Sequence, residues 1–205
     1  MSSENILHRA YKKVFHEGFK GSFTAGALIL MGAGFEETEL IAPLDLLRRA
    51  DVKVMTVGIG GKRITGGHGI TVEADITIDQ MDLTEMDMIV LPGGLGGVAT
   101  ARSSEKAMQA LRFAWENDKY VAAICAGPTV LADLGITDHK TVTCYPSCEG
   151  EMGSASVKAD VPCVTDGKLI TAASAGCAIA FGLALVAVLK GEETANKVKQ
   201  QIVVR

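Results

Sequence analysis

The sequence predicts one α/β domain built on a mostly parallel sheet with helices on both faces. Strand-length apolar runs alternate with stretches of helical periodicity along most of the 205 residues. The predicted strands are continuously apolar, which is typical of parallel strands buried on both faces. A chain of this length corresponds to about one domain, and we assign residues 22–205 to it.

The predicted elements follow one another in a regular order. Each strand is an apolar run that ends in glycine or polar residues, and the strands are TAGALILM (24–31), KVMTVGI (53–59), MDMIVLPGG (86–94), KYVAAI (119–124), TVTC (141–144) and KLITAAS (168–174). GITVEADITID (69–79) alternates in polarity, which predicts a hairpin or edge strands. Apolar residues recur at helical spacing between the strands, and the predicted helices cover 36–50, 103–117, a stretch that follows Cys125, 178–190 and 192–203.

The composition excludes several classes of protein. A net charge of −4 gives no basic footprint for nucleic acid. No apolar run reaches the roughly 18 residues that a membrane span requires. The five cysteines are odd in number and follow no secretory signal, so we expect no disulfide framework and a reducing, cytoplasmic location. Cys144 and Cys148 lack partners at zinc-site spacing, and we expect no metal.

Residues 1–21 differ in character from the rest of the chain. Leu7, Tyr11, Val14 and Phe15 fall at helical spacing among basic residues. This N-terminal extension could form an amphipathic docking helix or a weak organelle-targeting segment. Its acidic residues and its few arginines count against a transit peptide.

Two glycine-rich turns raise the question of a nucleotide cofactor. GAGFEE, from Gly32, has glutamate where the third glycine of G-x-G-x-x-G should be, and GIGGKR, from Gly58, has arginine there. A phosphate loop of the type G-x-x-x-x-G-K-[ST] is absent from the sequence. We therefore expect no cofactor.

Cys125 stands where a buried strand breaks off and a helix begins. A residue at such a strand-to-helix elbow displays its side chain above the sheet, and Pro128 suits the first turn of the following helix. Free N–H groups of that helix would favour the thiolate. Cysteine also packs as a small hydrophobe, so the local sequence leaves both a packing role and a chemical role open.

Glu39 favours the chemical role. On a helical wheel it falls at the edge of the apolar face of the predicted helix, beside Pro43 and Leu46. A carboxylate in that position is costly unless it is protonated or paired, and it could share a proton with a neighbouring sulfur. Acids in a first turn also favour the helix N-terminus, which explains their number but not the inward position of Glu39.

The glycine pair of LPGG supplies a third element. Gly93 and Gly94 end a predicted strand, where backbone N–H groups can approach a substrate oxygen. Together with the amide of Ala126, they could form an oxyanion hole. A Pro-Gly-Gly sequence is also an ordinary turn, so it carries weight only beside the other two elements.

These three strand ends resemble the ThiJ/PfpI superfamily, and within it the parkinsonism-associated deglycase branch, which is similar to glyoxalase III. The matching segments are GAGFEETELIAPLDLLRRA, VLPGG and AAICAGPTVL, and the likeness extends from about residue 27 to residue 204. The resemblance implies a flavodoxin-like three-layer sandwich and a homodimer. It also implies that Cys125 is the reactive cysteine, Glu39 its protonated partner, and Gly94 and Ala126 the oxyanion amides.

The sequence departs from the family pattern at two places that would line the pocket. Tyr145 replaces the family histidine, and its ordinary pKa of about 10 makes it a poor base at neutral pH. The usual Ser-Arg-Gly-Pro-Gly-Thr turn reads Ala172-Ala173-Ser174-Ala175-Gly176-Cys177. A Cys-His protease triad is thus disfavoured, and the pocket that includes Gly93, Tyr145 and Ala175 differs from that of its relatives.

Two functions remain in competition. The first is a cysteine-dependent enzyme on small reactive carbonyls, of the glutathione-independent glyoxalase or deglycase type, with an aldehyde or a glycated group as substrate. The second is a protective redox sensor or chaperone in which Cys125 is oxidised without significant turnover. A cysteine hydrolase or protease is a third and weaker alternative, because it lacks its base.

Overall fold

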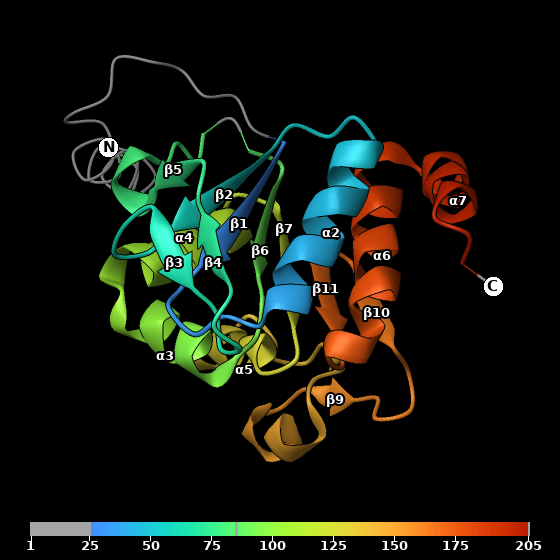
Figure 1. Cartoon of the computed structure of the whole chain (residues 1–205). Helices are drawn as coiled ribbons and strands as arrows, with labels where there is room; N and C mark the ends of the chain where they lie inside the picture. The colour runs from blue at the N-terminus through green and yellow to red at the C-terminus, as the bar shows by residue number, and fades with distance from the viewer. Residues whose placement is uncertain (1–25, 85, 205) are drawn as a thin grey trace, which may run out of the picture.

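The computed structural model describes residues 26–84 and 86–204, and its centre is a seven-stranded sheet (Figure 1). Across the sheet the strands are β10 (Cys163–Asp166), β11 (Leu169–Ala172), β7 (Tyr120–Ile124), β6 (Met88–Leu91), β1 (Ala27–Met31), β2 (Val54–Gly58) and β5 (Ile76–Thr77). Every neighbouring pair is parallel except β10 with β11. The predicted fold class is confirmed, whereas the predicted extension at residues 1–21 lies outside the described residues.

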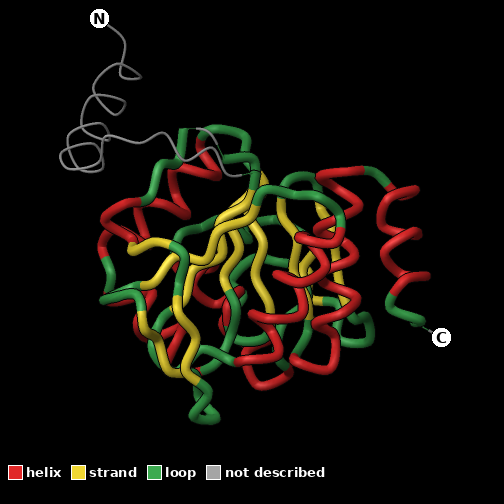
Figure 2. The backbone as a smooth tube through the Cα atoms, turned by 45° about the horizontal axis from the view of Figure 1, so that its top comes forward, coloured by secondary structure: helices red, strands yellow, loops and turns green. Residues whose placement is uncertain are grey.

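Helices cover both faces of this sheet, as Figure 2 shows by the red segments on either side of the yellow strands. One face packs against α2 (Glu37–Arg49) and α6 (Ala178–Lys190), and α7 (Glu192–Gln201) packs against α6. The other packs against α3 (Leu95–Ser103), α4 (Glu105–Glu116) and α5 (Gly127–Asp133). None of the helices in the described residues is both long and apolar enough to cross a membrane.

The strands are buried because their side chains feed two separate cores. Alternate residues of one strand point to opposite faces of a sheet. In β1, Leu28 and Leu30 belong to the α3–α5 core, whereas Ala27, Ile29 and Met31 belong to the α2–α6 core. This double burial is the physical reason for the continuous apolar runs in the sequence.

Smaller elements lie outside the main sheet. They are β3 (Arg63–Thr65) paired with β4 (Thr71–Glu73), β8 (Thr141–Val142) paired with β9 (Ser156–Val157), and the 3₁₀ turns η1 (Ile78–Gln80), η2 (Pro146–Glu151) and η3 (Ala175–Cys177). The segment 69–79 thus forms both a hairpin strand and an edge strand, in agreement with its alternating pattern. The predicted strand TVTC contributes only β8, which pairs outside the main sheet.

The helix α3 was not predicted, because its sequence LGGVATARS reads as a glycine-rich turn. The structure gives the two glycines a packing role. A Cβ added at Gly97 would lie 2.8 Å from the Cα of Phe35, and one added at Gly96 would lie 2.9 Å from the Ala33 carbonyl oxygen. Glycine therefore lets α3 approach the loop after β1, although it lowers the intrinsic helix propensity.

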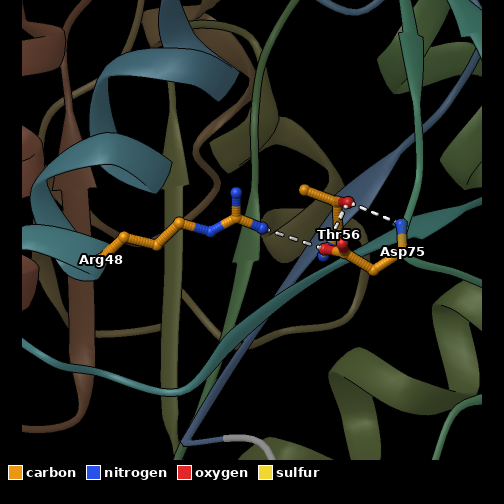
Figure 3. Close-up of polar contacts among 3 residues, drawn as sticks. All are labelled: Arg48, Thr56 and Asp75. Atoms are coloured by element: carbon orange, nitrogen blue, oxygen red, sulfur yellow. Dashed lines mark hydrogen bonds and ion pairs between the residues drawn. The ribbon is translucent and has the colours of Figure 1, made fainter.

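A polar cluster anchors the edge of the sheet (Figure 3). The Asp75 Oδ2 atom accepts hydrogen bonds from the Thr56 amide at 2.8 Å and from the Thr56 hydroxyl at 2.9 Å. Arg48 of α2 donates to the same oxygen at 3.3 Å. Thr56 is only 2% exposed, so Asp75 supplies the acceptor that its buried donors need.

We expect Asp75→Ala to lower the free energy of unfolding by about 1–3 kcal/mol, because the buried donors of Thr56 lose their acceptor. Asp75→Asn retains an oxygen at this position and should lose less than half as much. Urea denaturation of the three proteins measures the difference. Equal losses in both variants would show that the negative charge, not the acceptor, stabilises this edge.

Candidate active site

The carboxyl ends of β1, β6 and β7 meet at one edge of the sheet, where open α/β sheets bind their ligands. Cys125 directly follows β7, and its φ of 63° lies in the left-handed region. A non-glycine residue in that region is strained, and such strain gathers at functional sites. Two hydrogen bonds hold the strained residue, because the Cys125 amide donates to Ala172 O and its carbonyl oxygen accepts from the Tyr145 amide, both at 2.9 Å.

Glu39 enters this edge from the first turn of α2 and is completely buried, with 0% exposure. The amide of Gly93 donates to its Oε2 atom at 2.8 Å. Its Oε1 atom is buried and accepts no hydrogen bond from the described residues. The carboxyl lies within hydrogen-bonding range of the Cys125 thiol, so this sulfur is the group left to share a proton with Glu39.

The surroundings of the pair raise both pKa values. Burial raises the pKa of the Glu39 carboxyl to about 7, although the hydrogen bonds from Cys125 and Gly93 oppose the rise. Burial also raises the pKa of the Cys125 thiol to about 12, and the Glu39 carboxylate adds to that rise. The expectation of a low pKa for this thiol is therefore wrong, first because the sulfur is buried and second because the Glu39 carboxylate lies beside it. When Glu39 holds the proton, its charge no longer opposes the thiolate.

Two backbone amides point to the sulfur. The N–H groups of Ala126 and Gly94 lie beside the Cys125 sulfur, and both lower its pKa. Gly94 has a φ of 86°, and a Cβ at this position would lie 2.5 Å from the Gly34 carbonyl oxygen. Only glycine fits the backbone there, so the geometry that aims the Gly94 amide depends on its missing side chain.

The remaining predicted pocket residues lie around this centre. Gly93 fills the space between Glu39 and Cys125. The amide of Tyr145 donates a hydrogen bond to the Cys125 carbonyl oxygen, and Tyr145 is 45% exposed. Ala175 begins η3, which follows β11, the parallel neighbour of β7, and it therefore lies beyond the same sheet edge.

Sequence reasoning placed only one acid of the first turn inward, but Glu37 is also buried, with 6% exposure. Its Oε1 atom accepts from the amides of His68 at 2.8 Å and Ile70 at 3.3 Å, and its Oε2 atom lies 2.9 Å from His68 Nδ1. Glu37 thus holds the loop between β3 and β4 against α2. A run of three acids around a helix start gives no sign of such a distant partner.

Glu36, Glu37 and His68 bring possible metal ligands within 4.8 Å of one another. The Glu37 oxygens are already engaged by the loop, and Glu36 Oε2 accepts from the Glu39 amide at 2.7 Å as the helix cap. We therefore assign these residues a structural role in positioning α2 and the β3–β4 loop.

Comparisons with known proteins point in one direction. The DJ-1/PfpI family matches residues 25–188. The protein dj-1beta of Drosophila melanogaster is 36% identical over 180 residues, which are 87% of this chain and 96% of the relative. A protein of Pyrococcus abyssi that is named a deglycase is 33% identical over 164 residues, 80% of this chain and 98% of that protein.

Solved structures agree with these matches. The crystal structure of Drosophila DJ-1beta superposes with a TM-score of 0.85 at 34% identity and covers 89% of this chain and 100% of that chain. The structure of oxidized DJ-1 from Toxoplasma gondii gives a TM-score of 0.83 at 27% identity and covers 87% of this chain and 98% of that one. The residues that match the family, 25–188, include every strand of the central sheet and Cys125.

Proposed function

Because the chain belongs to the DJ-1/PfpI family, we propose that it is a cysteine-dependent enzyme acting on small reactive carbonyls. The proposed reaction is the conversion of methylglyoxal to lactate without glutathione, together with deglycation of groups that such carbonyls modify. The deglycase names of the archaeal relatives support this substrate class. We further propose that the enzyme acts in the cytoplasm as a homodimer and protects against carbonyl stress.

The observation that carries the proposal is the buried Glu39–Cys125 pair beneath two amides. A carboxyl with a pKa near 7 is poised to accept and return protons at neutral pH. A sulfur at a strained elbow is a suitable nucleophile, and the amides of Gly94 and Ala126, which lie beside this sulfur, would stabilise the negative charge on an added oxygen. Each component of an addition to an aldehyde is thus present.

The reaction balances without an external oxidant or reductant. The Glu39 carboxylate takes the thiol proton as sulfur bonds to the aldehyde carbon, and it returns the proton to the oxygen of the hemithioacetal. Glu39 then removes the hydrogen of that carbon as a proton, and the ketone oxygen takes up a proton to give an enediol. Glu39 delivers its proton to the former ketone carbon, while the hydroxyl of the first carbon loses its proton, so that in total the hydroxyl proton has passed to the ketone oxygen. The first carbon is oxidised to a thioester while the second is reduced to an alcohol, and water releases lactate and the free thiol.

A protease-like reaction fits this site less well. Tyr145 occupies the position of the family histidine, and its amide, rather than a basic side chain, contacts Cys125. Glu39 comes from the first turn of α2 and is fully buried, which suits proton transfer within a small adduct. A peptide bond would require a wider approach and an acid for the leaving amine.

A redox role is the second candidate. The similar structure of oxidized Toxoplasma DJ-1 supports it, as does the Glu39 carboxyl, which could donate a hydrogen bond to a sulfinate on Cys125. All five cysteines are free thiols. A sensor therefore requires Cys125 to oxidise before Cys144, Cys148, Cys163 and Cys177.

Lactate formation from methylglyoxal tests the enzymatic proposal. We expect the wild type to produce lactate and Cys125→Ser to lose at least about 100-fold in kcat/KM, because the weaker nucleophile replaces the thiol. Cys163→Ser, which changes another partly buried thiol, serves as the control. Undiminished lactate formation by Cys125→Ser would refute the mechanism. The redox role would be favoured if the wild type produced no lactate and if peroxide oxidised Cys125 before the other cysteines, as followed by intact mass.

A further inference from the structure

Three hydrogen bonds form a closed ring at the start of α2. Glu36 is the N-cap of this helix, and its Oε2 atom accepts from the Glu39 amide at 2.7 Å. The Gly93 amide donates to Glu39 Oε2 at 2.8 Å, and the Gly93 carbonyl oxygen accepts from the Glu36 amide at 3.0 Å. The ring therefore joins the helical turn that carries the proton carrier to the turn that follows β6.

Glu36 also packs against the next residue of that second turn. Gly94 directly follows Gly93, and a Cβ on Gly94 would lie 2.5 Å from the Glu36 nitrogen. The Gly94 amide is one of the two that lie beside the Cys125 sulfur and lower its pKa. A displacement of Glu36 would thus reach both the proton carrier and this amide.

Helix capping alone does not explain why this residue is a glutamate. The preferred N-caps are serine, threonine, aspartate and asparagine, whose short side chains reach the free amides of the first turn. The longer side chain of Glu36 must lose more rotamer freedom to accept the same hydrogen bond. Local preferences are most often broken at functional sites, which directs attention to the groups that the Glu36 carboxylate faces.

The negative charge of Glu36 acts on the proton carrier. Burial is the largest cause that raises the pKa of the Glu39 carboxyl, and the charge of Glu36 adds to it. The other titratable group that acts on this carboxyl is Cys125, which lowers its pKa. Glu36 therefore helps to hold Glu39 in the range where a carboxyl exchanges protons at neutral pH.

We propose that Glu36 is a positioning residue of the reaction, which holds Glu39 and the Gly93–Gly94 turn in register and places a negative charge beside Glu39. This inference rests on the proposed function, because it assumes that Glu39 transfers protons. A purely structural cap would use only the acceptor oxygen of Glu36. A positioning residue uses the oxygen and the charge, and the two should have separate effects.

Glu36→Gln and Glu36→Ala separate these two properties. Glutamine keeps an acceptor oxygen for the Glu39 amide but loses the charge, so the acid limb of kcat/KM for methylglyoxal should move to lower pH. We expect the ratio of kcat/KM at pH 6 to that at pH 8 to rise about twofold, the size typical of like charges three or four residues apart on a helix. Alanine also loses the acceptor, and its kcat/KM on the alkaline plateau should fall at least about 10-fold, because small displacements of reacting groups are costly.

Two further variants control for stability and for a neighbouring histidine. Ser104 caps α4 in the same way, since its Oγ atom accepts from the Ala107 amide. Ser104→Ala should lower Tm about as much as Glu36→Ala does, but it should leave kcat/KM and its pH dependence near those of the wild type. His68, whose pKa is raised by its hydrogen bond to Glu37, can also titrate near neutral pH, and His68→Asn should keep the wild-type acid limb.

The outcomes separate this inference from the proposed function. An unchanged acid limb in Glu36→Gln, or a plateau in Glu36→Ala as high as that of Ser104→Ala, overturns the role of Glu36 and leaves the reaction standing. If the wild type forms no lactate, the proposed function fails, and ¹³C NMR titration of the glutamate carboxyls still tests the inference, with Glu39→Gln identifying the Glu39 signal. A lower titration midpoint of Glu39 in Glu36→Gln supports the inference, and an unchanged midpoint overturns it.

Discussion

Glu39→Gln is expected to lower kcat/KM for methylglyoxal by at least about 100-fold, which is the contribution typical of a general acid–base group. Glutamine can keep the hydrogen bond from the Gly93 amide to its side-chain oxygen, but it cannot accept and return protons. The sulfur should remain reactive toward iodoacetamide, because the two backbone amides that lower its pKa are unchanged. Lactate assays and alkylation monitored by intact mass therefore give different answers for this variant.

The pH dependence provides a second readout of Glu39. The Glu39–Cys125 pair must lose one proton before it can act, whichever group holds the other. Because burial raises the pKa of Glu39 to about 7, we expect kcat/KM of the wild type to increase as the pH rises through about 7. An acid limb near the ordinary glutamate pKa, about 4.3, would show that Glu39 is not held as described.

Glu37→Gln is the matched control, since it makes the same change in the same buried helical turn. Glu37 holds the β3–β4 loop rather than the cysteine, and we expect kcat/KM to stay close to that of the wild type. Retention of more than a tenth of wild-type activity by Glu39→Gln would contradict its role as the proton carrier.

Gly93→Ala should disrupt the site and destabilise the fold together. An added Cβ would lie 2.5 Å from Glu39 Oε2, 2.7 Å from Cys125 Cβ and 3.0 Å from Ile124 O. No rotation of a surface side chain relieves these contacts, because Glu39 is buried and Ile124 O belongs to the backbone. Overpacking of this kind costs about 1–3 kcal/mol, and any relaxation must move Glu39 away from Cys125.

Thermal unfolding and lactate formation measure both effects. With about 1–3 kcal/mol lost, we expect Tm to fall by roughly 2–12 °C for a chain of this size, and kcat/KM to fall more than 10-fold because a small misplacement of reacting groups is costly. Gly150→Ala adds the same methyl group where no atom lies within 4 Å and should leave both quantities nearly unchanged. A stable, active Gly93→Ala protein would refute the close packing of the site.

Local patterns in the sequence were sufficient to predict the fold class and to single out the leading candidates for the site. The apolar runs of β1, β6 and β7 predict buried parallel strands, because each strand must satisfy a core on either face. Cys125 could be singled out because a strand that breaks at Gly127-Pro128 predicts an elbow. Glu39 could be singled out because a helical wheel places its carboxylate beside apolar residues.

Tertiary contacts decided what local patterns do not contain. The glycines of α3 predict a turn, and only the folded structure shows that the loop at Phe35 packs against them. The buried position of Glu37 depends on His68, 31 residues away. The Gly93 amide reaches Glu39 across 54 residues, and burial of the carboxyl between these segments is the largest cause that raises its pKa. The sequence alone determined which groups are chemically suited to react. The folded structure decided how deeply these groups are buried and which groups they contact, because burial and pairing depend on segments that are distant along the chain.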